Sequence, residues 1–330
     1  MILVSGGTGL IGSHLLHTLL EKKSAIRAIY RSEESLQKTQ KVFESYDSNH
    51  SIDEVEWVKA DITDYYSLKD IFPGITKVYH CAAMVSFDAR DVDAMMKINI
   101  EGTENMVNLS SEFNVEKFCY VSSVAALGKY PDHKCTDEDA LWQHSKDSSN
   151  YSISKYYAEN EVWRASEEGL EVVIVNPATV IGFGNWDESS SAIVKRVYDG
   201  LRFYTGGSNG FVGVQDVIRA MTVLMESEIT NERFLLVSEN LTFKKLLQTI
   251  ATGLGKKPPT LLASKKLANI LLKLDQFRAF ILQSRSVLTK ESVQTAYKDK
   301  CYSATKIQTK LGFEFAPMEG VIKSVTAQYR

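Results

Sequence analysis

The sequence predicts an α/β fold of the Rossmann type: a doubly wound parallel sheet followed by a smaller C-terminal lobe that binds substrate. Three observations support this class. Strand-like apolar runs alternate with helix-length segments from residue 1 to residue 182. A glycine-rich turn follows the first run, and the alternation stops after Pro177, where glycines become frequent. Alternation of this kind specifies a parallel sheet that is covered by helices on both faces.

Six apolar runs are the expected strands, and they are uniformly hydrophobic, as strands buried on both faces are. They are Ile2–Val4, Ala25–Tyr30, Val55–Ala60, Lys77–Cys81, Lys117–Ser122 and Val172–Asn176. The longer segments between them are expected to be helices. These include Leu10–Leu20, Asp91–Phe113 and Ser152–Glu168. Together these elements form the expected dinucleotide-binding domain, residues 1–182.

Residues 183–330 are expected to form mainly the substrate-binding lobe. Regular elements return at Asp216–Glu226, Arg233–Ser238 and Thr242–Gly253, and residues 233–237 are expected to return to the large sheet as a further strand. The apolar stretch 261–282 is interrupted by charged residues. It therefore predicts one or two amphipathic helices that cover the fold, and a membrane-surface or partner role stays open.

Composition excludes several other classes of protein. The chain has 330 residues, 44% hydrophobic and 24% charged, with a net charge of −3. It lacks the basic face of a nucleic-acid binder and the roughly 20 apolar residues of a membrane-spanning helix. Four scattered cysteines, Cys81, Cys119, Cys135 and Cys301, form neither a metal motif nor a disulfide framework. We interpret them as packing residues in a reducing compartment, which predicts a cytoplasmic protein without metal.

The most specific local motif lies between the first strand and the first helix. Gly6, Gly9 and Gly12 recur every three residues in the turn, and Thr8, Leu10 and Ile11 fill the positions between them. A pyrophosphate must approach backbone N–H groups closely, which excludes side chains, and a helix N-terminus supplies partial positive charge. The required strand precedes the glycines and the required helix follows them, so the turn predicts a dinucleotide phosphate site.

The end of the second strand indicates which dinucleotide is bound. An acidic residue there would bind the ribose of NAD, but Arg31 occupies this position. A guanidinium is suited to the 2′-phosphate of NADP, so NADP(H) is the preferred cofactor, with NAD(H) as a possible one. Asp61, after the third strand, is placed to meet the adenine amino group or to cap a turn.

A catalytic set is expected at the start of the helix that contains Tyr151 and Lys155. Their spacing of four residues puts both side chains on one face of that helix. An ammonium near the tyrosine would favour the phenolate, whose ordinary pKa is near 10. Ser123 follows the fifth strand and can hydrogen-bond the substrate oxygen.

Taken together, these motifs resemble the extended short-chain dehydrogenase/reductase family, over essentially the whole chain. The matching segments are Ser5–Gly12, Asp61–Ile62, His80–Ala83 with His in its first place, Asn99–Thr103, the set of Ser123, Tyr151 and Lys155, and Asn176–Gly182. The resemblance implies that Ile62, Ala82, Ala83, Pro177 and Val180 also contact the cofactor. It further implies a homodimer formed by the helices at 91–113 and 152–168.

Within this family the chain resembles the dihydroflavonol-reductase-like branch, which reduces aldehydes or ketones with NADPH. Tyr151 would protonate the substrate oxygen, Ser123 would hold it, and Lys155 would hold the cofactor ribose. Asn99 either positions a proton-relaying water or stabilises a helix kink. Met84, Phe87, Phe183 and Phe203 are expected to line the pocket of a small carbonyl or alcohol substrate, and core packing is the alternative for such side chains.

Two alternatives to a reductase stay open. A nucleotide-sugar epimerase would hold NAD tightly, and its pocket carries an arginine just before the motif that is Phe211–Val212 in this chain, where the arginine is missing. Lys195, Arg196 or Arg202 could take its place as the partner of a diphosphate. A non-catalytic NADP-sensing or scaffold protein would be free to lose Tyr151 or Lys155, and this chain keeps both.

Overall fold

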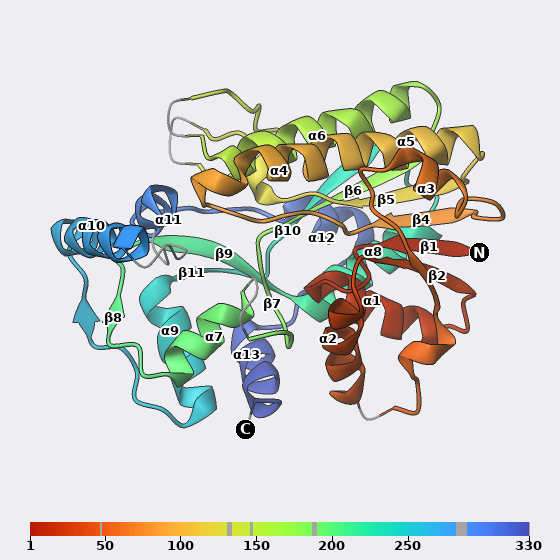
Figure 1. Ribbon diagram of the computed structural model, residues 1–330. Helices are drawn as coiled ribbons and strands as arrows, with labels where there is room; N and C mark the ends of the chain where they lie inside the picture. The colour runs from red at the N-terminus through yellow and green to blue at the C-terminus, as the bar shows by residue number, and fades with distance from the viewer. Residues whose placement is uncertain (47, 131–133, 146–147, 187–189, 282–288, 330) are drawn as a thin grey trace.

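The computed structural model of the protein describes residues 1–46, 48–130, 134–145, 148–186, 190–281 and 289–329 (Figure 1). Its centre is a seven-stranded sheet in which every neighbouring pair is parallel. The strand order is β10 (Glu232–Leu236), β6 (Val172–Pro177), β5 (Lys117–Val121), β4 (Lys77–His80), β1 (Ile2–Ser5), β2 (Ile26–Tyr30) and β3 (Glu56–Lys59). The Rossmann-type fold class predicted from the sequence is confirmed.

The strand order reverses between β1 and β4, because the chain builds outward from β1 to β3 and then continues from β4 on the other side. In open α/β sheets, ligands bind beyond the carboxyl ends of the strands at such a reversal. The glycine-rich turn after β1 and the loop after β4 both lie there, so the topology places the cofactor motif at the expected position.

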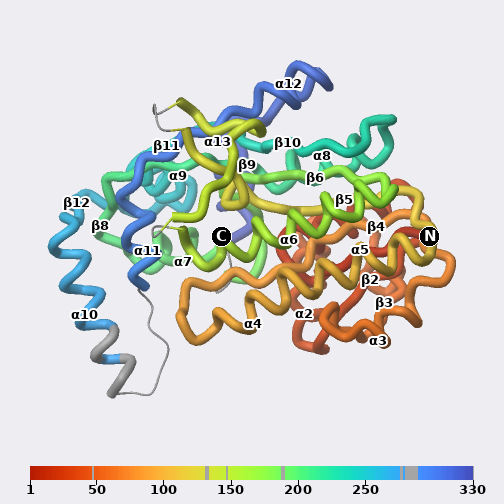
Figure 2. The backbone as a smooth tube through the Cα atoms, turned by 90° about the horizontal axis from the view of Figure 1, so that it is seen from above, coloured from red at the N-terminus to blue at the C-terminus, as the bar shows by residue number. Residues whose placement is uncertain are grey.

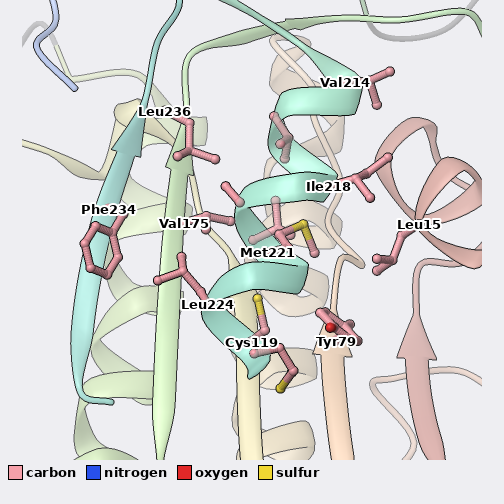
Figure 3. Close-up of a cluster of buried hydrophobic side chains, with 14 of the residues drawn as sticks. Leu15, Tyr79, Cys119, Val175, Val214, Ile218, Met221, Leu224, Phe234 and Leu236 are labelled. Carbon is pink, nitrogen blue, oxygen red and sulfur yellow. The ribbon is translucent and has the colours of Figure 1, made fainter. Parts of the chain in front are cut away.

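Helices cover both faces of the sheet. On one face, α1 (Leu10–Glu21) and α8 (Val214–Glu226) pack on a core that includes Leu15, Met221 and Phe234, with α2 (Glu33–Glu44) beside α1. Figure 3 shows α8 running along the strands, with side chains from the helix and the strands meeting in this core. On the other face, α3 (Tyr65–Lys69), α5 (Gly102–Glu112) and α6 (Asn150–Glu167) cover a second core.

The helix expected at Asp91–Phe113 forms without a gap, but it is not α-helical throughout. It consists of α4 (Val92–Met96), a π-helical turn η3 (Lys97–Glu101) and α5. At the start of α5, a Cβ on Gly102 would lie 2.5 Å from the Cδ1 atom of Ile62, so a larger residue would require the Ile62 side chain to move. A π-helical turn changes the direction of side chains within a helix and often marks a functional site. Here it contains Asn99.

The lobe is built around a small sheet of β11 (Glu239–Thr242), β9 (Ser208–Gly213) and β7 (Thr179–Ile181). Phe211, Leu246 and Met318 lie in the core that this sheet shares with α7 (Ser191–Tyr198), α9 (Phe243–Leu254) and α13 (Met318–Ala327). The two-residue strands β8 (Phe203–Tyr204) and β12 (Leu261–Leu262) form a separate pair. After β9 and α8 the chain re-enters the large sheet as β10, before α12 (Thr305–Leu311).

The described part of the amphipathic stretch, residues 261–281, contains β12 and one helix, α10 (Lys265–Ile281), while residue 282 lies outside the described residues. The helix α10 lies beside α11 (Lys290–Thr295) at the outer end of the lobe (Figure 2). Ala268 and Leu272 of α10 pack against Val293 of α11, while Ile270 and Leu274 are exposed. Among the residues that the structure describes, no helix has both the length and the apolar character needed to cross a bilayer.

One expectation about the cysteines is wrong. Cys81 and Cys119 are free, and Cys119 is a buried packing residue, but Cys135 and Cys301 form a disulfide across 166 residues of sequence. The pairing follows from tertiary structure, because Thr136 and Tyr302, the residues next to these cysteines, form a parallel β-bridge. No rule of cysteine spacing predicts a contact that depends on two distant loops meeting.

Candidate active site

The glycine-rich turn between β1 and α1 leaves no room for side chains. Gly6 has a φ of +67°, and a Cβ there would lie 2.5 Å from the backbone nitrogen of Ala82 in the loop after β4. A Cβ on Gly12 would lie 2.1 Å from the carbonyl oxygen of Gly6. Gly9 closes the turn by donating its N–H to the same carbonyl oxygen at 3.0 Å. Because no side chains project here, the backbone of the glycine-rich turn and that of the loop at Ala82 can both lie close to a ligand.

The N-terminus of α1 is available to an anion. Gly9 is its N-cap and supplies no capping side chain, and the first turn contains no acidic residue. The N–H groups of that turn, including those of Leu10 and Ile11, carry the partial positive charge of the helix dipole. This arrangement fits the pyrophosphate of a dinucleotide, which these backbone groups would hold.

Arg31 and Asp61 flank the adenosine end of this expected site. Arg31 is exposed just after β2, and Asp61 is half-buried after the neighbouring strand β3. The pKa of Asp61 is lowered from its ordinary value. Burial raises this pKa, but the hydrogen bonds from the Thr63 N–H and hydroxyl and the charges of Arg31 and Lys97 together lower it by more. Thr63 occupies Oδ1 of Asp61 at 2.9 Å, so the aspartate also stabilises its own turn.

Ser123 and Tyr151 lie together at the carboxyl end of β5. Ser149 caps α6 by accepting the Ser152 N–H, and the Ser152 hydroxyl donates to the carbonyl oxygen of Ala125 at 2.6 Å. These bonds hold the start of α6 against the short helix η4 (Val124–Ala126), which follows Ser123. Ser123 and Tyr151 are joined by a side-chain hydrogen bond. The structure thus brings the two residues into one constellation.

The pKa of Tyr151 differs from the sequence-based expectation. Burial raises it above 10, and the hydrogen bond with Ser123 opposes the rise without cancelling it. Lys155, expected to favour the phenolate, directs its Nζ elsewhere in this structure: it donates to the Tyr120 hydroxyl at 2.7 Å and to the Val121 carbonyl at 3.0 Å. The phenol of Tyr151 is therefore protonated at neutral pH.

Lys155 is only 1% exposed, and this burial dominates its chemistry. Removal from water lowers the pKa of its ammonium from 10.5 to about 7, although Glu159 and Cys81 raise it. The ammonium also lies 4.4 Å from the centre of the Tyr120 ring. Its two hydrogen bonds leave one N–H for a ligand, since an ammonium has three donors.

Asn99 clamps the loop that follows β4. Its Oδ1 accepts the Met84 N–H at 2.7 Å, and its Nδ2 donates to the Met84 carbonyl at 3.0 Å and to the Ser154 hydroxyl at 2.9 Å. Both amide hydrogens are thus used, which gives the side chain a positioning role between the π-helical turn, the Met84 loop and α6. The water-relay role remains untested.

A buried polar network behind Ser123 was not predicted. Oε2 of Glu159 accepts hydrogen bonds from Ser122 at 2.5 Å and Asn176 at 2.7 Å, and Oε1 accepts from Arg233 at 3.0 Å. Asn176 also donates to the carbonyl oxygen of Ser123 at 3.1 Å. The network ties α6, β5, β6 and β10 together. In the sequence, the signal for this network is Glu159, one helical turn after Lys155. The network is completed by Arg233, which lies on the strand that returns to the large sheet.

The four expected substrate residues lie in different places. The ring of Phe87, 39% exposed, lies 6.2 Å from that of Tyr151, and Met84 is held in the same loop by Asn99. Phe183 instead packs on Tyr329 of the lobe, with ring centres 4.7 Å apart. Phe203 is on β8 at the outer part of the lobe, also 39% exposed, and no described contact joins it to Tyr151 (Figure 1).

The remaining cofactor candidates lie where the topology places a ligand. Ala82 and Ala83 follow β4, Pro177 ends β6, and Val180 is in β7 immediately beyond it. Ile62, by contrast, is buried beneath Gly102. Among the described residues, no group of three or more His, Cys, Asp or Glu side chains could hold a metal ion.

Comparison with known proteins agrees with this geometry. The model of the NAD dependent epimerase/dehydratase family matches residues 2–236. The putative dihydroflavonol 4-reductase of Synechocystis sp. is 28% identical over 264 residues, which cover 78% of this chain and 73% of that protein. Sterol demethylase protein B of Methylococcus capsulatus is 25% identical over 99% of this chain and 98% of its own length.

Solved structures show the same fold. The crystal structure of gox2253 covers 100% of this chain and 98% of its own, with a TM-score of 0.80 and 26% identity. The UDP-glucose 4-epimerase of Thermotoga maritima, at 21% identity, has a TM-score of 0.76 over 100% of this chain and 98% of its own. The protein therefore belongs to the NAD dependent epimerase/dehydratase family, on its dihydroflavonol-reductase-like branch, and is an NAD(P)-dependent enzyme of the extended short-chain dehydrogenase/reductase type.

Proposed function

We propose that the protein reduces a ketone or aldehyde with NADPH, or oxidises the corresponding alcohol with NADP⁺. The observation that carries this proposal is the constellation of Ser123, Tyr151 and Lys155 at the carboxyl end of β5, next to an open dinucleotide cradle. Relatives named dihydroflavonol 4-reductase, cinnamoyl-CoA reductase and anthocyanidin reductase support a carbonyl substrate.

Each residue has a distinct role in the proposed reduction. NADPH, held by the cradle and Lys155, would supply the hydride for the carbonyl carbon. Tyr151 then gives its phenolic proton to the substrate oxygen, as a general acid with a raised pKa can do at neutral pH. Ser123 donates a hydrogen bond to the same oxygen, where negative charge develops. The third N–H of Lys155 is available to a ribose hydroxyl.

The proposed preference for NADP(H) depends on Arg31. Its exposed guanidinium follows β2, the strand next to β1 and its cradle. A 2′-phosphate there would form a charge-assisted pair, which contributes about 1.5–3 kcal/mol for a hydrogen bond to a charged group. Asp61 offers its second carboxylate oxygen to the adenine amino group.

The epimerase alternative is weakened by the lobe. Asn209, two residues before Phe211, donates to the Thr179 hydroxyl at 2.9 Å, and no arginine stands beside it to bind a diphosphate. The non-catalytic alternative is disfavoured, because this chain keeps Tyr151 and Lys155 and its curated relatives include several reductases.

The test is to denature freshly purified protein and identify any nucleotide that is released, then to titrate the empty site with NADPH and NADH. We expect little retained nucleotide and tighter binding of NADPH. Retained NAD in near-stoichiometric amount would contradict the proposal, because an enzyme that recycles one bound cofactor does not exchange it at each turnover.

Two further predictions concern the whole molecule. We propose a homodimer through the outer faces of α5 and α6, and a monomer in gel filtration at micromolar concentration would exclude it.

The cytoplasmic location stays a proposal. The Cys135–Cys301 disulfide argues against it, because reducing compartments keep such thiols reduced. Counting free thiols in native protein from its source distinguishes a reduced Cys135 and Cys301 pair, as in the cytoplasm, from the disulfide.

A further inference from the structure

A buried chain of hydrogen bonds and ring stacking leads from the first strand to Lys155. It joins Ser5 of β1, His80 of β4, Thr103 of α5, Tyr120 of β5 and Lys155 of α6, none of which is more than 1% exposed. The proposed reaction uses only the last of these residues. His80 is also the position where the sequence departs from the asparagine of the family motif.

The direction of every bond in this chain can be worked out from its hydrogens. Thr103 donates its only hydroxyl hydrogen to the Asn99 carbonyl at 2.6 Å, so it must accept from Nε2 of His80 at 3.0 Å. Nδ1 of His80 therefore carries no hydrogen and accepts from the Ser5 hydroxyl at 2.5 Å. Burial lowers the pKa of His80 to about 3, which keeps this neutral tautomer in place.

Tyr120 lies between His80 and Lys155. Its hydroxyl oxygen accepts from Nζ of Lys155 at 2.7 Å. The ring of Tyr120 stacks on His80, with centres 5.4 Å apart and planes inclined by 21°. The phenol therefore cannot rotate away from Lys155 without breaking contacts on both sides.

We propose that Tyr120 is a positioning residue for Lys155: its hydroxyl, on a ring that stacks on His80, fixes the ammonium so that one N–H stays directed to the cofactor, and Thr103 supports this arrangement by holding His80. This inference rests on the proposed role of Lys155 as the residue that holds the cofactor ribose. A hydroxyl oxygen that accepts from the ammonium favours the charged lysine, and this opposes the effect of burial.

Tyr120→Phe tests the proposal, because it keeps the ring, the stacking and the buried volume and removes only the hydroxyl. The readout is NADPH affinity as a function of pH, which needs no knowledge of the carbonyl substrate. We expect about ten-fold weaker binding at pH 7, and loss of affinity with rising pH should begin at a lower pH than in the wild type, because the ammonium loses an acceptor. The other groups that face Lys155, namely Glu159, Cys81 and His80, are unchanged in this variant.

Three variants separate positioning from folding. Tyr79→Phe removes a hydroxyl from a buried tyrosine of β4 that belongs to the core on the other face of the sheet, and should leave the affinity and its pH dependence unchanged. Thr103→Val should weaken binding in the same direction as Tyr120→Phe, and Thr103→Ser, which keeps the hydroxyl, should restore it. Circular dichroism confirms that each variant is folded.

Equal NADPH affinity and equal pH dependence in the Tyr120→Phe and Tyr79→Phe variants would overturn the inference. A wild type that binds NADPH with the expected pH dependence but reduces no carbonyl compound would contradict the proposed function alone, because the binding readout still decides the role of Tyr120.

Discussion

The two sides of the candidate site are built in different ways. On the side of the large sheet, Lys155, Asn99 and Glu159 are buried, and hydrogen bonds to neighbouring strands and loops hold each of them. On the opposite side, Phe87 is 39% exposed in the loop after β4. We therefore propose that the chemistry is placed on the rigid side and that substrate is selected on the adaptable side.

The largest expected effect concerns the rigid cradle. Gly12→Ala places a Cβ 2.1 Å from the Gly6 carbonyl, and the turn can accommodate it only by moving away from the phosphate site. We expect dinucleotide affinity to fall about a hundred-fold, since such overpacking costs about 1–3 kcal/mol and the phosphate contacts are lost as well.

The matched control for this prediction is Gly320→Ala in α13 of the lobe, where an added Cβ meets nothing within 4 Å. It should leave affinity unchanged and stabilise the helix by about 0.5–1 kcal/mol. Calorimetric titration and thermal melting measure both effects. Equal affinities of the two variants would contradict the assignment of the cradle.

A second prediction uses the burial of Lys155. In the unfolded chain a lysine stays protonated up to about pH 10.5, whereas Lys155 in the folded protein loses its proton near pH 7. The unfolded state binds more protons between these values, so this lysine makes the free energy of unfolding rise with pH there, by about 2–4 kcal/mol in total.

Denaturant unfolding of the wild type and of Lys155→Met from pH 7 to pH 10 measures this slope. The rise in the free energy of unfolding that is due to Lys155 should be present in the wild type and missing in Lys155→Met. Lys273→Met removes an exposed lysine of α10 and should keep the wild-type slope. Parallel pH curves for the wild type and Lys155→Met would show that the lysine is not buried as described.

A third prediction separates the two dinucleotides. Arg31→Ala removes the guanidinium proposed to meet the 2′-phosphate, so the dissociation constant for NADPH should rise about ten-fold while that for NADH stays the same. Fluorescence titration with both dinucleotides measures the change. An equal loss for both would place Arg31 outside phosphate recognition.

The smallest effect is expected on the adaptable side. Phe87→Ala should raise KM for the substrate a few-fold, because the ring lies 6.2 Å from that of Tyr151, and leave kcat nearly unchanged. Phe203→Ala should change neither KM nor kcat, because Phe203 lies on β8, which pairs with β12 and makes no described contact with Tyr151. Steady-state kinetics on both variants decides this, and a larger effect at Phe203 would show that the lobe closes over the site.

The same contrast explains what could be predicted from the sequence. The strands of the large sheet were found because each is a continuous apolar run bounded by turn residues, and the cradle because its glycines stand between a strand and a helix. β7, β8, β9, β11 and β12 were missed. β7, β8 and β12 have only two or three residues, which carry no periodicity, and β9 and β11 are short strands with polar residues, β9 with two glycines as well.

Contacts between distant residues were also beyond the sequence. The Cys135–Cys301 disulfide and the network of Glu159 with Arg233 depend on how segments far apart in the chain meet. Phe203 was assigned to the pocket because it is aromatic and lies in the lobe, but its place on β8 is set by pairing with β12. Aromatic residue type alone does not distinguish a pocket wall from an outer strand.

The most direct test of the central claim is the consumption of NADPH in the presence of a panel of ketones and aldehydes, measured side by side for the wild type and Tyr151→Phe. Loss of a general acid costs about a hundred-fold or more in rate. We predict that the wild type oxidises NADPH with at least one of these substrates and that Tyr151→Phe binds NADPH equally well but turns over at least about a hundred-fold more slowly. Equal turnover by the two proteins would contradict the account.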